Sequence, residues 1–444
     1  MTSSRVFLHL LTGAQTVLDE GFSSLPETTE APLPPAAATV LAAAARRMQD
    51  NFPYANPLYA GQMLKPPHVV ARAAYAMAMA VNPNNHALDG GRASSRMELE
   101  AVAAIAVMFG LPQHLGHLSS GGTFANLEAL WVAGQLHPGR GIAASEQAHY
   151  THSRISGVLA LPFHTVAVDE RNCMDLGDLE KHLRTGKIGT VVVTLGTTAT
   201  GAVDPLEQIL ALRARYEFRI HVDAAYGGYF TLASNLEAAA TLAYAAISQA
   251  DSIVVDPHKH GLQPYGCGCI LFRDPSVGRL YRHDSPYTYF TSSDLHLGEI
   301  SLECSRAGAS AVALWSTQQL FPLVPGGDFA RGLEACHRAA LNLHALLQGS
   351  PAFVTSPHLP QLDIVFWAMR GDSVEQSSAR AQQVFTAAAA LGLHLALARL
   401  PVALFPAGTW TAGDSVLCLR SVLMKWEHLD WIERIFQVVL RATS

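Results

Sequence analysis

Lys259 is the residue of this chain best suited to covalent chemistry. It closes the motif Asp-Pro-His-Lys, which directly follows a β-branched apolar run at residues 253–255. Burial disfavours an ammonium ion, so a lysine at the end of a buried strand is a candidate amine nucleophile for Schiff-base chemistry. Such a lysine can also run along apolar surface to water, and this motif alone does not decide between the two.

Three further polar groups could complete a site around such a lysine. The run from Ser120 to Thr123 is Ser-Gly-Gly-Thr and opens a helical pattern, where free backbone N–H groups favour an anion. Asp223 follows an apolar strand pattern, and His149 follows a short apolar stretch. Each also has a plain structural reading, because Ser, Thr and Asp commonly cap helices and an isolated histidine is commonly structural.

The elements that would position these groups form an alternating pattern. Strands are predicted at 191–195, 219–222, 253–255 and 268–272, with helical patterns between them. This alternation predicts a mainly parallel sheet with helices on both faces. In such sheets ligands collect at the carboxyl ends of the strands, so Asp223 and Lys259 are expected to meet there.

The same motifs resemble those of the group II pyridoxal-phosphate-dependent amino acid decarboxylases. They are Asp-Pro-His-Lys, Ser-Gly-Gly-Thr, the Ala-His-Tyr around His149 and the His-Val-Asp-Ala-Ala around Asp223, and they occur in the order of that family. The resemblance covers about residues 50–440 and is strongest to the bacterial tyrosine decarboxylase branch. It implies fold type I of the aspartate aminotransferase superfamily. That fold is an α/β fold with a mainly parallel seven-stranded sheet flanked by helices and a small C-terminal α/β domain.

The resemblance also implies a domain division and roles for individual residues. We expect an N-terminal helical segment at 1–68, a large cofactor-binding domain at 69–322 and a small domain at 323–444. Pyridoxal phosphate would form a Schiff base with Lys259, His149 would stack on its ring, and Asp223 would keep the ring nitrogen protonated. The further cofactor-binding residues implied are Ser120, Gly121, Gly122, Thr123, Thr197, Ala225, His258, Thr291 and Ser292.

A loop of the neighbouring subunit completes the site in the resembled family. Tyr287 or Tyr289 on this loop would return a proton to the substrate carbon. The active protein would accordingly be a homodimer with shared active sites. The candidate residues of the substrate pocket are Tyr59, Gln62, Asn85, His86, Arg306 and Arg420.

The reaction implied is decarboxylation of an L-amino acid to the amine and carbon dioxide through a quinonoid intermediate. A Cα–Cβ lyase related to sphingosine-phosphate lyase, an aminotransferase and a decarboxylation-dependent oxidative deaminase remain compatible with the motifs. So does a non-catalytic dimer partner that has kept the fold. The sequence does not identify the amino acid.

The composition limits the remaining classes of function. Of 444 residues, 49% are hydrophobic and 15% charged, which is typical of a compact globular protein, and the net charge of −6 argues against nucleic acid as a partner. We expect no membrane span, no signal peptide and no metal site, since His-Glu-x-x-His is absent and no cysteine pair is completed. The six scattered cysteines suit reduced thiols in the cytoplasm.

Overall fold

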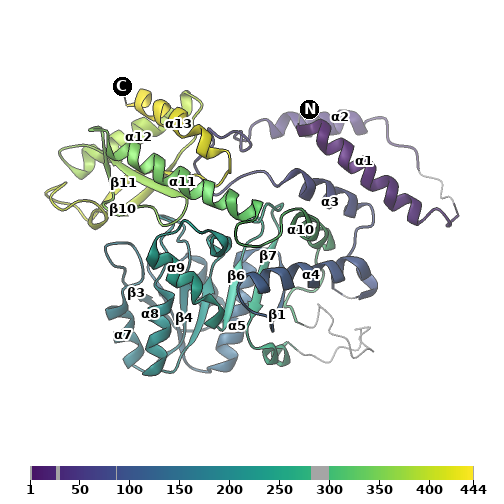
Figure 1. Cartoon of the computed structure of the whole chain (residues 1–444), viewed down its shortest axis with the longest axis horizontal. Helices are drawn as coiled ribbons and strands as arrows, with labels where there is room; N and C mark the ends of the chain where they lie inside the picture. The colour runs from purple at the N-terminus through teal and green to yellow at the C-terminus, as the bar shows by residue number, and fades with distance from the viewer. Residues whose placement is uncertain (1–2, 27–30, 87, 282–299, 444) are drawn as a thin grey trace.

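A seven-stranded sheet forms the centre of the protein (Figure 1). The computed structural model describes residues 3–26, 31–86, 88–281 and 300–443. The strand order is β1-β7-β6-β5-β4-β2-β3; β7 runs antiparallel to both its neighbours, and the other pairs are parallel. The strands are β1 (Leu115–Ser119), β2 (Gly141–Ser145), β3 (Phe163–Val166), β4 (Ile188–Thr194), β5 (Arg219–Asp223), β6 (Ser252–Val255) and β7 (Gly268–Phe272).

Both faces of this sheet are covered. Alternate side chains of a strand point to opposite faces, so neighbouring residues show what each face packs against. In β6, Ile253 and Val255 belong to one hydrophobic core, whereas Val254 belongs to a second core on the other face. Burial on both faces explains the apolar runs Ile253–Val255 of β6 and Cys269–Phe272 of β7, and the predicted fold class is confirmed. The helices of this part are α4 (Arg92–Met108), α5 (Gly122–Leu136), α6 (Thr151–Val158), α7 (Leu176–Arg184), α8 (Leu206–Ala211), α9 (Ala238–Ala245) and α10 (Gly308–Leu320).

A smaller α/β unit follows α10 and has its own core. Its antiparallel sheet has the order β10-β11-β9-β8. Helix α13 buries Ile432, Ile435, Phe436 and Val439 in this core, a spacing that places them on one helix face. The elements are α11 (Asp328–Gln348), β8 (Phe353–Thr355), β9 (Ile364–Met369), α12 (Val374–Ala390), β10 (Ala396–Pro401), β11 (Ser415–Val422) and α13 (His428–Ala442).

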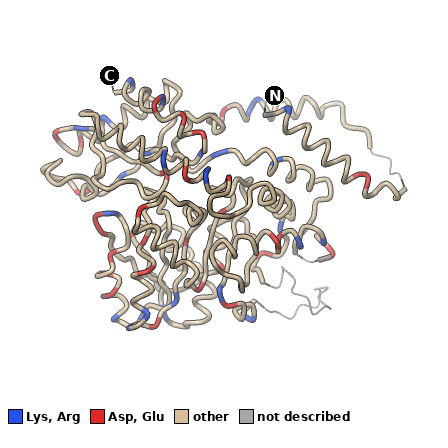
Figure 2. The backbone as a smooth tube through the Cα atoms, viewed as in Figure 1, with Lys and Arg blue, Asp and Glu red and all other residues tan. Residues whose placement is uncertain are grey.

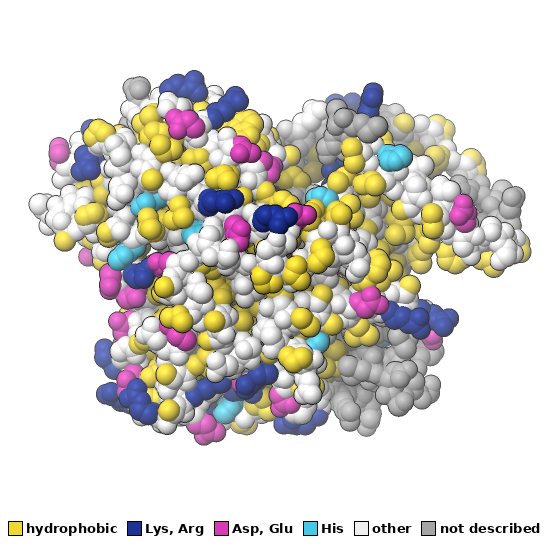
Figure 3. Space-filling view, viewed as in Figure 1, with side chains coloured by type: hydrophobic (Ala, Val, Ile, Leu, Met, Phe, Trp, Pro, Cys, Tyr) yellow, Lys and Arg dark blue, Asp and Glu magenta, His cyan; other side chains and the backbone are white. Residues whose placement is uncertain are grey.

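The first helices extend away from these two units (Figure 1). Helix α1 (Ser3–Gly21) packs on α3 (Val69–Met79), whereas α2 (Ala37–Met48) has no buried residue. Both extended helices carry exposed apolar side chains, including Val17 on α1 and Leu41 on α2. Figure 3 shows hydrophobic side chains gathered on this projecting part of the molecule.

Charged residues of both signs are mixed along the chain (Figure 2). Lys and Arg lie close to Asp and Glu around the large sheet, as in the pairs Arg213–Asp251 and Arg215–Glu180. Among the described residues, no helix combines the length and the apolar character that crossing a membrane would require.

Candidate active site

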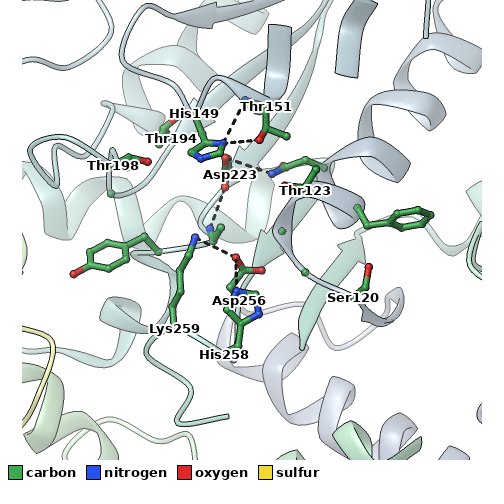
Figure 4. Close-up of a pocket in the computed structure, with 17 residues that line it drawn as sticks. Ser120, Thr123, His149, Thr151, Thr194, Thr198, Asp223, Asp256, His258 and Lys259 are labelled. Atoms are coloured by element: carbon green, nitrogen blue, oxygen red, sulfur yellow. Dashed lines mark hydrogen bonds and ion pairs between the residues drawn. The ribbon is translucent and has the colours of Figure 1, made fainter. Parts of the chain in front are cut away.

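A cavity of about 440 Å³ opens at the carboxyl ends of the strands (Figure 4). Segments that follow β1, β2, β4, β5 and β6 line it, as expected for a parallel sheet. The cavity brings together most of the residues predicted to hold the cofactor, although they are far apart in the sequence. These are Ser120, Gly121, Gly122, Thr123, His149, Asp223, Ala225, His258 and Lys259.

Lys259 reaches into this cavity from the turn after β6. Its Nζ lies 3.1 Å from Oδ2 of Asp256, and the side chain of Lys259 is 22% exposed, so the amine is accessible from the cavity. Asp256 is 3% exposed and lies in the cavity wall. The nearby His258 ring has its Nε2 3.5 Å from the same Oδ2.

Asp223, the last residue of β5, is fixed by three donors. His152 Nε2 lies 2.7 Å from Oδ2, the backbone N–H of Ala225 donates to Oδ1 at 3.1 Å, and Asn126 Nδ2 lies 3.5 Å from Oδ2. Because a carboxylate only accepts, His152 donates from Nε2. Burial alone would raise the pKa of Asp223, but the hydrogen bond and charge of His152, with the charge of Lys259, hold that pKa below its ordinary value.

His149 presents its ring to the cavity from the loop after β2. The backbone N–H of Thr151 donates to its Nδ1 at 3.3 Å, and the Thr151 hydroxyl lies 2.6 Å from the same atom. Burial, aided by the charge of Lys259, lowers the pKa of His149, so the ring is neutral near pH 7. A neutral, apolar-faced imidazole is suited to packing against a flat aromatic ring.

The start of helix α5 forms a cradle whose geometry suits an anion. Gly121 has a φ of 148°, a conformation that favours glycine, and no side chain of the described chain caps the first turn of the helix. The helix therefore directs free backbone N–H groups and the positive end of its dipole to the cavity. A Cβ on Gly122 would lie 2.6 Å from Oδ2 of Asp256, so glycine keeps this space open.

Several predicted site residues lie elsewhere. Thr197 is buried outside the lining, with its hydroxyl 3.0 Å from that of Thr200, while its neighbours Gly196 and Thr198 line the cavity. The loop residues Tyr287, Tyr289, Thr291 and Ser292 lie outside the described residues.

The six candidates for the substrate pocket form two groups outside the lining of this cavity. In one group, Arg306 pairs with Glu98 at 2.7 Å and lines a separate cavity of about 230 Å³. Asn85 donates to the same Glu98, and His86 Nδ1 lies 3.5 Å from Cys304 Sγ.

The second group lies at the junction of the large and small units. Arg420 of β11 donates from Nη2 to Thr198 O at 2.6 Å and from Nε to Ala199 O at 3.0 Å. Its Nη1 lies 3.2 Å from Gln62 Oε1, and Tyr59 is 4% exposed beside them. The Arg420 guanidinium is therefore used to bind backbone carbonyls of the loop that lines the cavity.

Other lining residues were not predicted from the sequence: Phe124, Asn126, Thr151, Thr194, Tyr226 and Asp256. His152 was also missed, although it supports Asp223 from behind the cavity wall. The available signals were their positions next to predicted site residues. His152 is three residues after His149, and Asp256 is three residues before Lys259.

Comparison with known proteins identifies the family. A family model described as the pyridoxal-dependent decarboxylase conserved domain matches residues 136–368, more than half of the chain. The chain belongs to the pyridoxal-dependent decarboxylase family. The matched span contains His149, Asp223 and Lys259, and the predicted resemblance is confirmed.

Curated relatives support the same assignment. The L-tyrosine decarboxylase of Enterococcus faecium is 28% identical over 418 residues, covering 70% of this chain and 68% of that protein. A probable L-tyrosine/L-aspartate decarboxylase of Methanothermobacter thermautotrophicus is 29% identical over 260 residues, covering 58% of this chain and 69% of that protein. This member of the pyridoxal-dependent decarboxylase family is therefore a pyridoxal phosphate-dependent amino acid decarboxylase, and cleavage of a Cα–Cβ bond or amino transfer is not favoured.

Solved structures show the same fold. Mouse CSAD in apo form has a TM-score of 0.78 at 18% identity, with 99% of each chain covered. Oryza sativa TDC, solved with PLP and tryptamine, has a TM-score of 0.78 at 17% identity, covering 99% of this chain and 98% of that chain. The cavity of this chain fits pyridoxal phosphate, because it has an open anion cradle, a fixed carboxylate, a neutral imidazole and an accessible lysine.

Proposed function

We propose that the cavity described above is the decarboxylation site and that Lys259 carries the cofactor. The observation that supports this most directly is the convergence of the α5 cradle, His149, Asp223 and Lys259 on one cavity. When bound, pyridoxal phosphate supplies an electron sink for the negative charge that decarboxylation leaves on the substrate α carbon.

The residues of the chain would divide the remaining work. Gly122 and Thr123, at the start of α5, bind the phosphate through their backbone N–H groups and the helix dipole, whereas the backbone N–H of Ser120 already donates to Oε2 of Glu303 at 3.0 Å. Asp223, held in place and ionised by His152, accepts a hydrogen bond from the ring nitrogen and keeps the proton there. His149 packs on the ring and excludes water from one of its faces.

A second observation supports decarboxylation over amino transfer. An aminotransferase needs a free cation to hold the substrate carboxylate, whereas a decarboxylase has to release that group. Arg420, the residue of β11 considered for this role, directs its donors to Thr198 O and Ala199 O instead. The carboxylate is then free to leave, since this guanidinium is already satisfied.

L-tyrosine is the first substrate to test, followed by L-aspartate, because relatives with these names match 70% and 58% of this chain. Phe124 and Tyr226 in the lining offer apolar contacts to an aromatic side chain. Tyr287 or Tyr289 is proposed to return the proton to the α carbon. Pocket roles for Tyr59, Gln62, Asn85, His86 and Arg306 are proposed likewise, whereas Arg420 is proposed to hold the loop at Thr198 and Ala199.

The test is mass spectrometry of cofactor-loaded protein with L-tyrosine, L-aspartate and a pool of the other common L-amino acids. We expect one amine and an equal amount of carbon dioxide. The Lys259→Ala variant is expected to lose both the visible absorbance of the bound cofactor and turnover, while Lys181→Ala, at an exposed lysine of α7, retains them. An aldehyde or keto acid as the product would contradict the proposal, and a colourless wild type would indicate an inert protein.

We also propose a homodimer with shared active sites, located in the cytoplasm. The exposed apolar side chains of α1 and α2 need a cover, and a second copy of the chain would supply one. All six cysteines are free thiols, as suits a reducing compartment. Light scattering is expected to give twice the chain mass of 47.5 kDa for the wild type. Leu41→Glu is expected to lower that mass, and Leu391→Glu, at an exposed residue directly after α12, is expected to leave it unchanged.

A further inference from the structure

Two carboxylates line the cavity, and they differ in what they bind. Asp256 is the one within ion-pair distance of Lys259, with Nζ and Oδ2 3.1 Å apart. Asp223 has a donor on each oxygen, His152 on Oδ2 and the Ala225 N–H on Oδ1. Asp223 is therefore already satisfied without the lysine.

Among the described residues, one oxygen of Asp256 has no partner, whereas both oxygens of Asp223 have one. Oδ1 of Asp256 is buried and has no hydrogen-bond partner within the described part of the chain. Its Oδ2 lies beside the start of α5, since a Cβ on Gly122 would be 2.6 Å from it. The positive end of the helix dipole stabilises a negative charge there, so the carboxylate can remain in place when the lysine is bonded elsewhere.

We infer that Asp256 is a positioning residue that receives the Lys259 ammonium whenever Nζ is not bonded to the cofactor. This inference rests on the proposed function of Lys259. An incoming substrate ammonium takes the place of Nζ on the cofactor and gives up two protons, which end on Nζ, and no electrons are transferred. The lysine released in this exchange is a cation inside the protein, and Asp256 is its counter-ion.

The electrostatics give this pairing its effect on the exchange. An ammonium held in a largely buried cavity is unfavourable without a partner. By stabilising the released lysine, Asp256 shifts the exchange toward the cofactor bonded to the incoming amine. Asparagine at this position would keep the shape and one acceptor but remove the charge.

The experiment uses cofactor-loaded full-length protein and methylamine, a probe that needs no knowledge of the substrate. Borohydride reduction after equilibration fixes the cofactor on whichever nitrogen holds it, and intact-mass spectrometry measures the fraction fixed on Lys259. For Asp256→Asn, we expect the methylamine concentration that halves this fraction to rise about tenfold, equivalent to about 1.4 kcal/mol. Asp414→Asn, at an exposed loop residue of the small unit, is the matched control and is expected to behave as wild type.

Each result decides the inference. Equal curves for Asp256→Asn and wild type would overturn it, because the charge would then have no effect on the exchange. Asp256→Ser, a smaller uncharged variant, replaces Asp256→Asn if that protein fails to fold. If neither folds, the carboxylate has a structural role and the inference is wrong. A wild type that takes no cofactor onto Lys259 would instead refute the proposed function.

Discussion

Replacing His152 with leucine is expected to destabilise the cofactor-free protein by about 2 kcal/mol at pH 7, the typical value of a hydrogen bond to a charged group. The side chain of His152 is 0% exposed and that of Asp223 is 6% exposed, so solvent does not screen their 2.7 Å contact. The variant leaves Asp223 with the Ala225 N–H and the distant Asn126 amide. His152→Gln can still donate a hydrogen bond to Asp223, so its stability is expected to fall less than that of His152→Leu.

The effect is expected to depend on pH in one direction. His152 holds the pKa of Asp223 below its ordinary 3.8, against the opposing effect of burial. The stability that this pair contributes is present above pH 3.8 and is lost as the pH falls below that value. The unfolding curves of His152→Leu and wild type are therefore expected to approach each other in acid.

Urea unfolding of a double-mutant cycle with Asp223→Asn measures the pairing itself. We expect a coupling free energy of about 1–2 kcal/mol at pH 7 between positions 152 and 223. If His152→Leu lost as much stability in the Asp223→Asn background as in wild type, the hydrogen bond would not be the cause, and packing of the ring would explain the loss.

Three further predictions concern the cradle and the domain junction. Gly122→Ala is expected to weaken cofactor binding at least tenfold by titration, because its Cβ would meet the Asp256 carboxylate, whereas Gly157→Ala, with no atom within 4 Å, is expected to bind normally. Burial lowers the pKa of Lys425 from 10.5 to about 8, so the wild type gains stability relative to Lys425→Met as the pH rises from 8 to 10.5, measured by urea unfolding. Arg420→Lys is expected to lose about 2–4 kcal/mol by calorimetry, because lysine lacks the fork that reaches both carbonyls; an unchanged unfolding temperature would argue against that role.

The elements of the fold that could be predicted are those with a clear pattern in their own residues. Strands β4 and β6 contain β-branched apolar runs, β5 alternates Ile220 and Val222 with polar residues, and the polar residues at the ends of these strands indicated the cavity. Strands β1 and β2 were not predicted as strands, because Leu-Gly-His-Leu-Ser and Gly-Ile-Ala-Ala-Ser have few β-branched residues and become strands through their neighbours.

The supporting residues of the site were harder to predict. His152 contacts Asp223 across 71 positions of sequence, and Arg420 meets the Thr198 carbonyl across 222. Such contacts depend on how separate elements pack, which no local pattern contains. Lys259, Asp223 and the start of α5 could be predicted because each follows a strand, and a mainly parallel sheet brings the ends of its strands to one edge.

The order of the strands also affects when the site can exist during folding. The cradle follows β1, whereas Lys259 follows β6. Strand β7 lies between β1 and β6 and pairs with both. Before β7 has formed, β1 and β6 of a nascent chain are not held side by side. The cofactor site is therefore incomplete until residue 272 has been added to the sheet. Binding then stabilises only the finished sheet, since a ligand adds stability only to the form that binds it. Only chains with a complete sheet are then stabilised by the cofactor. Chains without bound cofactor are expected to be degraded first by proteases.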